Sequence, residues 1–105
     1  GIFVLCCPEV ATMLINSGAP IPTDSTSAVA FQTSLLHLQI ALEDAFIQIA
    51  RASNENCVII FDRGCMDGSA YVSAKQWDMI LDELNTTTPM LRDRRYDCVV
   101  HFVTA

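Results

Sequence analysis

Basic residues are scarce in this sequence of 105 residues. Lys and Arg together number 6 against 12 Asp and Glu, so the formal net charge is −6. Duplex nucleic acid is held through many phosphate contacts from Lys and Arg, and an acidic chain offers no general surface of that kind. We therefore expect no nucleic-acid partner.

Long hydrophobic runs are also missing. No apolar run approaches the roughly 18 residues needed to span a bilayer, and the opening run 2–7 lacks the basic flank and the length of a signal peptide. We therefore expect no transmembrane segment and a cytoplasmic protein. Membrane association of a parent protein stays open, although nothing in these residues supports it.

The cysteines lack the spacing of a disulfide framework or a zinc site. There are 5 of them, an odd number, and Cys6 and Cys7 are adjacent. No Cys-x-x-Cys pair occurs, and His37 and His101 are isolated in the sequence. Cys65 has no nearby histidine in the sequence to stabilise a thiolate. The sequence therefore predicts buried, reduced thiols and no cysteine catalysis.

Apolar side chains, by contrast, are abundant. Hydrophobic residues make up 51% of the chain and charged residues 17%, which is typical of one compact domain with a buried sheet. Three runs, 2–7, 57–61 and 98–103, are β-branched and aromatic without polar alternation, as in parallel strands covered on both faces. We predict one α/β domain over residues 1–105 with the order βαβαβ.

Helix signals occupy the segments between these runs. A long helix of about 20 to 25 residues is expected because apolar residues recur at spacings of four and three; they are Phe31, Leu35, Leu38, Leu42, Phe46 and Ile49. Start and stop signals predict shorter helices: from Pro8 to the stop at Asn16-Ser17-Gly18, from the capping box Ser73 to Gln76, and from Thr88-Pro89 through Arg95.

Polar residues that follow the three apolar runs define a candidate site. In open α/β sheets, ligands bind beyond the carboxyl ends of the strands. We therefore expect convergence at one edge of the residues that follow the runs: Glu9 after the first, Asp62, Arg63 and Asp67 after the second, and Thr104 after the third.

The chemistry of these residues suits phosphoryl transfer, with an alternative for each. Asp62 closes an apolar strand, as a magnesium ligand does, or it caps the next turn. Arg63 can clamp a phosphate, or it forms a salt bridge to Glu9 or Asp67. Glu9 can accept a substrate proton or join the metal shell, or it complements the start of a helix.

A second stripe on the long helix is polar. Gln32, Gln39 and Glu43 share it with Leu36. Such a row can line a substrate cleft, whereas a solvated helix face is the commoner reason for it.

Together these motifs resemble the NadR/TRPL translocation defect protein group of P-loop NTPases, whose AAA-type domain is similar to nucleoside and thymidylate kinases. The resemblance covers nearly the whole chain and rests on four blocks: Cys7-Pro-Glu-Val-Ala-Thr12; Phe31-Gln32 with Gln39 and Glu43; Val58-Ile-Ile-Phe-Asp-Arg-Gly64 with Asp67-Gly-Ser-Ala-Tyr71; and Leu91-Arg-Asp-Arg-Arg-Tyr-Asp97 before Val99-Val-His-Phe-Val-Thr-Ala105.

The resemblance implies a three-layer parallel sheet of strand order 2-3-1-4-5 and Mg²⁺ with ATP or GTP as ligand. Asp62 would be the Walker-B-like metal ligand, and Arg63 would contact phosphate. Glu9 would be the substrate-side carboxylate. From their positions after the apolar runs, we expect Asp67 and Thr104 to bind the nucleotide cofactor together with Arg63.

The family's phosphate loop, Gly-x-x-x-x-Gly-Lys-Ser/Thr, does not occur in these residues. The resemblance therefore implies an incomplete domain, without the first strand and its phosphate loop and without the lid and last strand. The three runs would be strands 2, 3 and 4 of the family order, with the missing strand between the second and third runs. We expect the isolated chain to be inactive.

Three functions fit the resemblance and the site. The first is a nucleotide-dependent regulatory or trafficking switch that binds Mg-GTP or Mg-ATP and acts on protein partners. The second is a small-molecule kinase for a nucleoside or ribosylnicotinamide-like substrate, with Glu9 as base and Arg63 on the phosphate. The third is an interaction module that has lost nucleotide binding.

Overall fold

The computed structural model describes residues 1–104 and has mixed α/β architecture. Two parallel strands, β1 (Ile2–Cys7) and β2 (Asn56–Phe61), pair along their whole length, with Ile2 opposite Asn56 and Cys7 opposite Phe61. The first two predicted strands are therefore confirmed as neighbours in a parallel sheet. The sheet has two strands in the described residues, so the larger three-layer sheet stays an expectation.

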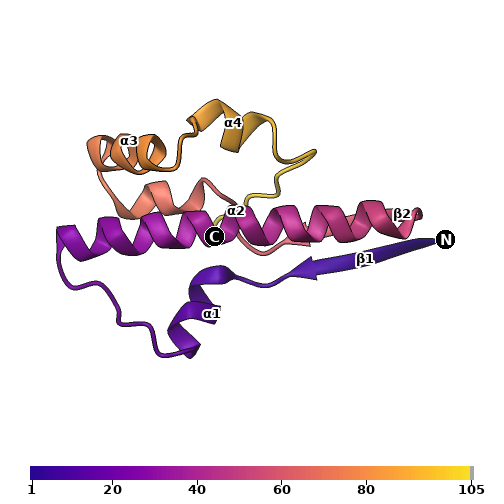
Figure 1. The fold of residues 1–105 in the computed structure, drawn as a ribbon, viewed down its shortest axis with the longest axis horizontal. Helices are drawn as coiled ribbons and strands as arrows, with labels where there is room; N and C mark the ends of the chain where they lie inside the picture. Colours follow the sequence, from indigo (N-terminus) through magenta and orange to yellow (C-terminus); the bar gives the residue numbers. More distant parts are fainter. Residues whose placement is uncertain (105) are drawn as a thin grey trace.

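The long helix α2 (Ser25–Ser53) runs through the middle of the molecule, beside both strands (Figure 1). It has 29 residues, more than the sequence predicts, because its first turn is capped earlier. The Asp24 carboxylate accepts a hydrogen bond from the Ser27 backbone N–H at 2.7 Å, and the Ser27 hydroxyl lies 3.2 Å from the Asp24 N–H. Within residues 1–104, no helix combines the length and hydropathy needed to cross a membrane.

The shorter helices lie close to where the start and stop signals place them, but the first of them begins two residues later than predicted, because its N-cap is Glu9 and Pro8 precedes the helix. In the capping box the Ser73 hydroxyl accepts from the Gln76 N–H and the Gln76 side chain accepts from the Ser73 N–H. The fourth helix ends just before Arg94, two residues earlier than expected. Its N-cap is Thr87. The elements are α1 (Val10–Asn16), the short 3₁₀ helix η1 (Asp67–Tyr71), α3 (Ala74–Glu83) and α4 (Thr88–Asp93).

The hydrophobic core lies between α2 and the later helices, on a side of α2 that the sequence does not predict. Its members come from α2, the loop after β2, α3 and α4: Leu36, Cys65, Trp77, Ile80, Leu81 and Leu91. The expected apolar stripe on α2 is only partly buried, and Ile49 at its end is 57% exposed. Because α2 carries apolar residues on more than one side, periodicity alone does not indicate which side packs against α3.

The sheet is covered on one face, whereas the sequence predicts cover on both. Side chains facing α2, such as Leu5 and Ile59, are half-buried. Those on the opposite face are exposed: Ile2, Val4, Cys6, Val58 and Ile60. The strands are apolar on both faces although, within residues 1–104, helices pack against one of them.

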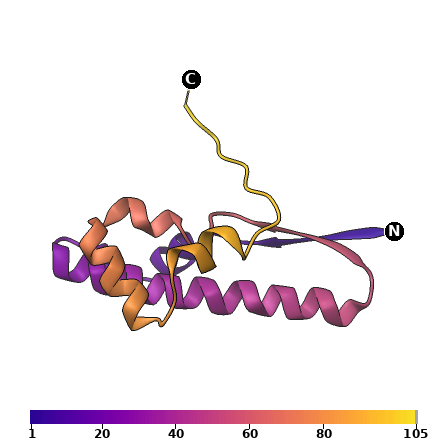
Figure 2. The ribbon, with the colours of Figure 1, turned by 90° about the horizontal axis from the view of Figure 1, so that it is seen from above.

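The third apolar run, 98–103, is not a strand, which corrects the βαβαβ prediction. Its side chains are exposed, with Phe102 at 90%, and Figure 2 shows this segment leading away from the helices and β1. A strand forms only where a neighbour supplies ladder hydrogen bonds, and β1 and β2 pair with each other alone in the described residues. The strand order that the resemblance implies would place another strand between this run and β2.

Truncation of Ile80 tests the position of the core. Ile80 is fully buried, so Ile80→Ala leaves a cavity and should lower the free energy of unfolding by about 3 kcal/mol. Met79 is 55% exposed, so the control Met79→Ala should cost less than about 1 kcal/mol. Urea unfolding followed by the fluorescence of Trp77 measures both. Equal effects of the two substitutions would contradict this core.

Candidate functional site

The carboxyl ends of β1 and β2 bring Glu9 and Asp62 to one hollow. The strands end in register, and the Asp62 N–H donates to the Cys7 carbonyl at 3.1 Å, so the residues that follow the two strands are neighbours. A hollow of about 480 Å³ lies there, lined by Pro8, Glu9, Thr12, Met13, Asn16 and Asp62. The predicted convergence of these two carboxylates at one edge of the sheet is thus what the structure shows; their chemical roles stay predictions.

The Glu9 side chain is free to act on a ligand. Glu9 occupies the N-cap position of α1, yet its carboxylate makes no capping hydrogen bond. The helix therefore does not use this carboxylate as a hydrogen-bond acceptor. A half-buried carboxylate beside Asp62 can take part in metal binding or accept a proton from a hydroxyl.

Arg63 lies next to the hollow in an unusual backbone conformation. Its φ is 72°, in the left-handed region that a non-glycine residue adopts only at a cost of about 1 to 2 kcal/mol. Its side chain is exposed, and among the ion pairs of residues 1–104 it takes part in none. The alternative of a salt bridge to Glu9 or Asp67 is therefore not what the structure shows.

Asp67 and Thr104 do not line the hollow with Glu9 and Asp62. The Asp67 carboxylate accepts a hydrogen bond from the Gly64 N–H at 3.0 Å and so shapes the loop after β2. Thr104 is exposed and does not line the hollow. Nucleotide contact by these two residues stays a prediction.

The loop after β2 rests on a buried polar cluster, which we call the Glu43 cluster. It consists of Gln39, Glu43, Cys65, Arg95 and Tyr96. One Glu43 oxygen, Oε2, accepts from Gln39 Nε2 at 2.6 Å and from the Tyr96 hydroxyl at 2.8 Å. The other, Oε1, accepts from Arg95 Nε at 3.0 Å and lies 3.6 Å from the Cys65 thiol. Arg95 also bonds the carboxylate of Asp44 at 2.8 Å.

Burial dominates the electrostatics of this cluster. Glu43 is 1% exposed, and its charge is matched by the Arg95 guanidinium. Burial raises the pKa of the Tyr96 hydroxyl, and it raises the pKa of the Cys65 thiol to about 12. For Arg95, burial acts to lower the pKa of the guanidinium, but the hydrogen bonds that it donates to the carboxylates of Asp44 and Glu43 outweigh burial, so the pKa is raised.

The polar stripe of α2 therefore differs from both interpretations of the sequence. Gln39 and Glu43 are buried, so the solvated face was wrong, and in this conformation neither reaches the hollow. Gln32 is half-buried, with its amide oxygen against Gly68. Substrate binding by the three residues stays a prediction that the geometry does not favour.

Sequence reasoning missed Arg95 and Tyr96 as partners of α2. They were visible only as part of the block 91–97 that carried the resemblance. The Gln39 and Glu43 side chains, four residues apart beside the apolar Leu36, were the available signal that a polar pair on a core helix needs buried partners.

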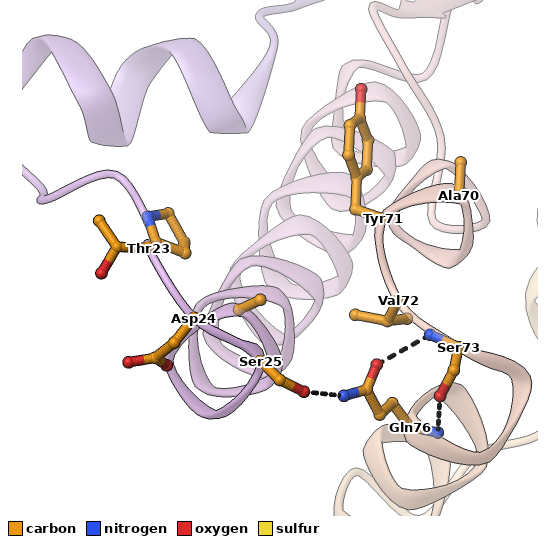
Figure 3. A pocket seen from close by; sticks show the side chains of 10 residues that line it. Thr23, Asp24, Ser25, Ala70, Tyr71, Val72, Ser73 and Gln76 are labelled. Carbon is orange, nitrogen blue, oxygen red and sulfur yellow. Dashed lines mark hydrogen bonds between the residues drawn. The ribbon is translucent and has the colours of Figure 1, made fainter.

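A second hollow, of about 500 Å³, lies where the N-termini of α2 and α3 meet (Figure 3). The Gln76 amide donates to the Ser25 hydroxyl and thereby joins the two helix starts. The Asp24 carboxylate is already used as a helix cap. The predicted site residues lie elsewhere: the residues that line this hollow are Pro22, Thr23, Asp24, Ser25, Ala28, Ala70, Tyr71, Val72, Ser73 and Gln76.

A scan of protein-family models matches residues 2–105 to a family described as an AAA domain. The match covers nearly the whole chain, so the chain belongs to this family, which is part of the P-loop NTPase superfamily. Searches of the curated proteins and of the solved structures found no match. Family membership thus supports a nucleotide-binding P-loop NTPase, the coarser part of what the sequence suggests.

Thiol reactivity tests the environment of Cys65. With a pKa of about 12, Cys65 holds far less thiolate at pH 8 than a free cysteine of pKa about 8.5, and it is 2% exposed. The prediction of buried thiols is wrong for Cys6 and Cys98, which are exposed. Iodoacetamide should therefore alkylate Cys6 and Cys98 at least about a hundredfold faster than Cys65. Peptide mass mapping gives the rates, and denaturant should remove the difference. Equal native rates for Cys65 and Cys98 would contradict this environment.

Proposed function

We propose that these residues form the metal side of a Mg-nucleotide site in a P-loop NTPase that acts as a nucleotide-dependent regulatory switch. The observation that carries the proposal is the shared hollow of Glu9 and Asp62 at the carboxyl end of parallel strands. Ligands of open α/β sheets bind at this end, and the AAA domain match makes nucleotide the expected ligand.

The residues of the hollow fit a magnesium ion. Mg²⁺ is bound through one or two carboxylates, several waters and substrate phosphates rather than by a full protein cage. Asp62 and Glu9 offer two carboxylates, and Thr12 and Asn16, which carry side-chain oxygens, also line the hollow. Within the described residues, no group of three or more His, Cys, Asp or Glu side chains is arranged so that it could hold a metal ion, and Mg-nucleotide does not need one. When bound, Mg²⁺ would neutralise phosphate charge beside Asp62.

The unpaired guanidinium of Arg63 suits a second role at this site. An arginine held in a fixed backbone conformation, exposed and without an ion-pair partner among residues 1–104, can engage phosphate oxygens through two parallel hydrogen bonds. The phosphate loop would be supplied by residues outside this sequence, since residues 1–105 carry no Gly-x-x-x-x-Gly-Lys-Ser/Thr pattern. Residues 1–105 would then be one part of a larger P-loop domain.

One observation favours a small-molecule kinase as the second candidate. The Glu9 carboxylate makes no cap hydrogen bond and lies beside the proposed metal ligand, where it can accept the proton of a substrate hydroxyl. A kinase would transfer phosphate to a nucleoside-like acceptor, whereas a switch would yield no phosphorylated product. A panel of nucleosides incubated with Mg-ATP and Mg-GTP separates the two.

Substitution of Asp62 tests the site. In the full-length protein, Asp62→Asn removes one metal-binding charge and should weaken Mg-ATP or Mg-GTP binding by about tenfold, which corresponds to about 1.4 kcal/mol. Binding measured with EDTA in place of Mg²⁺ should hardly change. Asp78 is exposed on α3, away from the hollow, so Asp78→Asn is the matched control and should bind like the unaltered protein.

Isothermal titration calorimetry measures these affinities. Equal Mg-dependent affinities for Asp62→Asn and the unaltered protein would overturn the metal assignment. Failure of the full-length protein to bind either nucleotide would overturn the proposed function and leave the interaction module as the better account.

A further inference from the structure

The loop after β2, residues 62–67, carries Asp62 and Arg63 and is held from behind by the Glu43 cluster. We propose that Tyr96, anchored on Glu43, is a positioning residue that sets the conformation of this loop. The inference rests on the proposed function for its consequence, the correct placement of Asp62 and Arg63 toward Mg-nucleotide. Tyr96 itself does not line the hollow.

A hydrogen-bond relay connects the loop to α2 through Tyr96. The Cys65 backbone N–H donates to the Tyr96 hydroxyl oxygen at 2.7 Å, and the hydroxyl donates its proton to Glu43 Oε2 at 2.8 Å. Tyr96 thus uses its oxygen as acceptor and donor at once. The relay fixes the distance between the loop backbone and α2, because both hydrogen bonds are short and the final acceptor, Glu43, is a buried carboxylate.

Packing brings the Tyr96 ring against both ends of the short stretch that contains Asp62 and Arg63. On one side the ring meets Phe61 edge to face, with centroids 5.9 Å apart. On the other it lies so close to Gly64 that a Cβ atom there would come within 3.2 Å of the hydroxyl oxygen. Phe61 and Gly64 bracket the two site residues, so a movement of Tyr96 displaces the backbone on which both are carried.

Arg63 shows that the loop conformation has to be maintained. A non-glycine residue with φ of 72° persists only where the surroundings over-determine it. The surroundings here supply two further contacts. Gln39 Nε2 reaches the Arg63 carbonyl at 3.5 Å, and Asp67 holds the Gly64 N–H at 3.0 Å.

Glu43 is in turn fixed by groups that are not part of the loop. The Arg95 guanidinium forms an ion pair with Glu43, with Nε 3.0 Å from Oε1, and a second ion pair with Asp44, with Nη2 2.8 Å from Oδ1. Asp44 is the next residue of α2. Arg95 also precedes Tyr96 in the chain. Glu43 and Asp44 on α2 therefore fix Arg95 and Tyr96, two consecutive residues after α4. Tyr96 in turn holds the loop through its hydrogen bond with the Cys65 N–H.

Tyr96→Phe removes the relay and keeps the ring. In the full-length protein we expect the Cys65 amide to exchange hydrogen at least tenfold faster, with amides in the middle of α2 unchanged. We also expect Mg-nucleotide to bind about tenfold more weakly. Tyr71 is the chain's other tyrosine and is 66% exposed, so Tyr71→Phe is the matched control and should change neither quantity.

A second variant covers the case in which Tyr96→Phe does not fold. Gly64→Ala keeps every hydrogen-bonding group but pushes against the Tyr96 hydroxyl, which must shift by a few tenths of an ångström. It should likewise weaken Mg-nucleotide binding and raise exchange at Cys65. Gly64→Ala thus displaces the Tyr96 hydroxyl from the loop while every polar group of the core remains, so it tests the same role of Tyr96 by a second route.

Two results would overturn the inference. One is unaltered Mg-nucleotide affinity in a folded variant whose Cys65 amide exchanges faster, since Tyr96 would then support only the fold. The other is exchange that rises throughout α2 and α3 rather than in residues 62–67. If the unaltered protein binds no Mg-nucleotide, the proposed function fails by itself, and the exchange pattern alone decides whether Tyr96 sets the loop.

Discussion

The Glu43 carboxylate is the group on which the arrangement of this chain depends. A buried carboxylate is tolerated only when a cation and hydrogen-bond donors replace the water that it has lost. Glu43 receives donors from its own helix, from Cys65 after β2, and from Arg95 and Tyr96, which lie 52 and 53 positions further along the chain. Removing any of these segments would leave a buried charge without its full set of partners.

The same constraint links the core to the candidate site. Parallel strands that end in register carry Glu9 and Asp62 to neighbouring positions, and this needs only the β1–β2 pairing. The direction taken by the chain beyond Asp62 is a separate matter, because Arg63 is in a left-handed conformation. Tyr96 and Gln39 fix that direction from the side of α2. The sheet thus brings the carboxylates together, and the Glu43 cluster orients the loop behind them.

Much of the local structure could be predicted from the sequence because its signals are local. Continuous apolar runs indicated β1 and β2, the capping box at Ser73 indicated the start of α3, and the open-sheet rule placed Glu9 and Asp62 at one edge. The run 98–103 is apolar and β-branched like the strands. It is not a strand, because strand formation depends on a neighbouring edge that local composition does not report.

The buried side of α2 could not be predicted for a related reason. Leu38 and Leu42 mark one apolar side, and Leu36 lies on another beside Gln39 and Glu43. Periodicity favours the side with more apolar residues, whereas the structure buries the side on which a carboxylate finds a partner in Arg95. That partner is distant in sequence, and no spacing rule connects it to the helix.

A double-mutant cycle on Glu43 and Arg95 tests the central claim most directly. Glu43→Gln and Arg95→Gln should each lower the free energy of unfolding by about 3 kcal/mol, because each leaves a buried or half-buried charge without its partner. The double variant should lower the free energy of unfolding by about 2 kcal/mol less than the sum of the two single effects. The exposed pair Arg92 and Asp93 serves as reference and should couple by less than about 1 kcal/mol. Additive effects at Glu43 and Arg95, within about 0.5 kcal/mol, would show that the carboxylate does not hold the structure together.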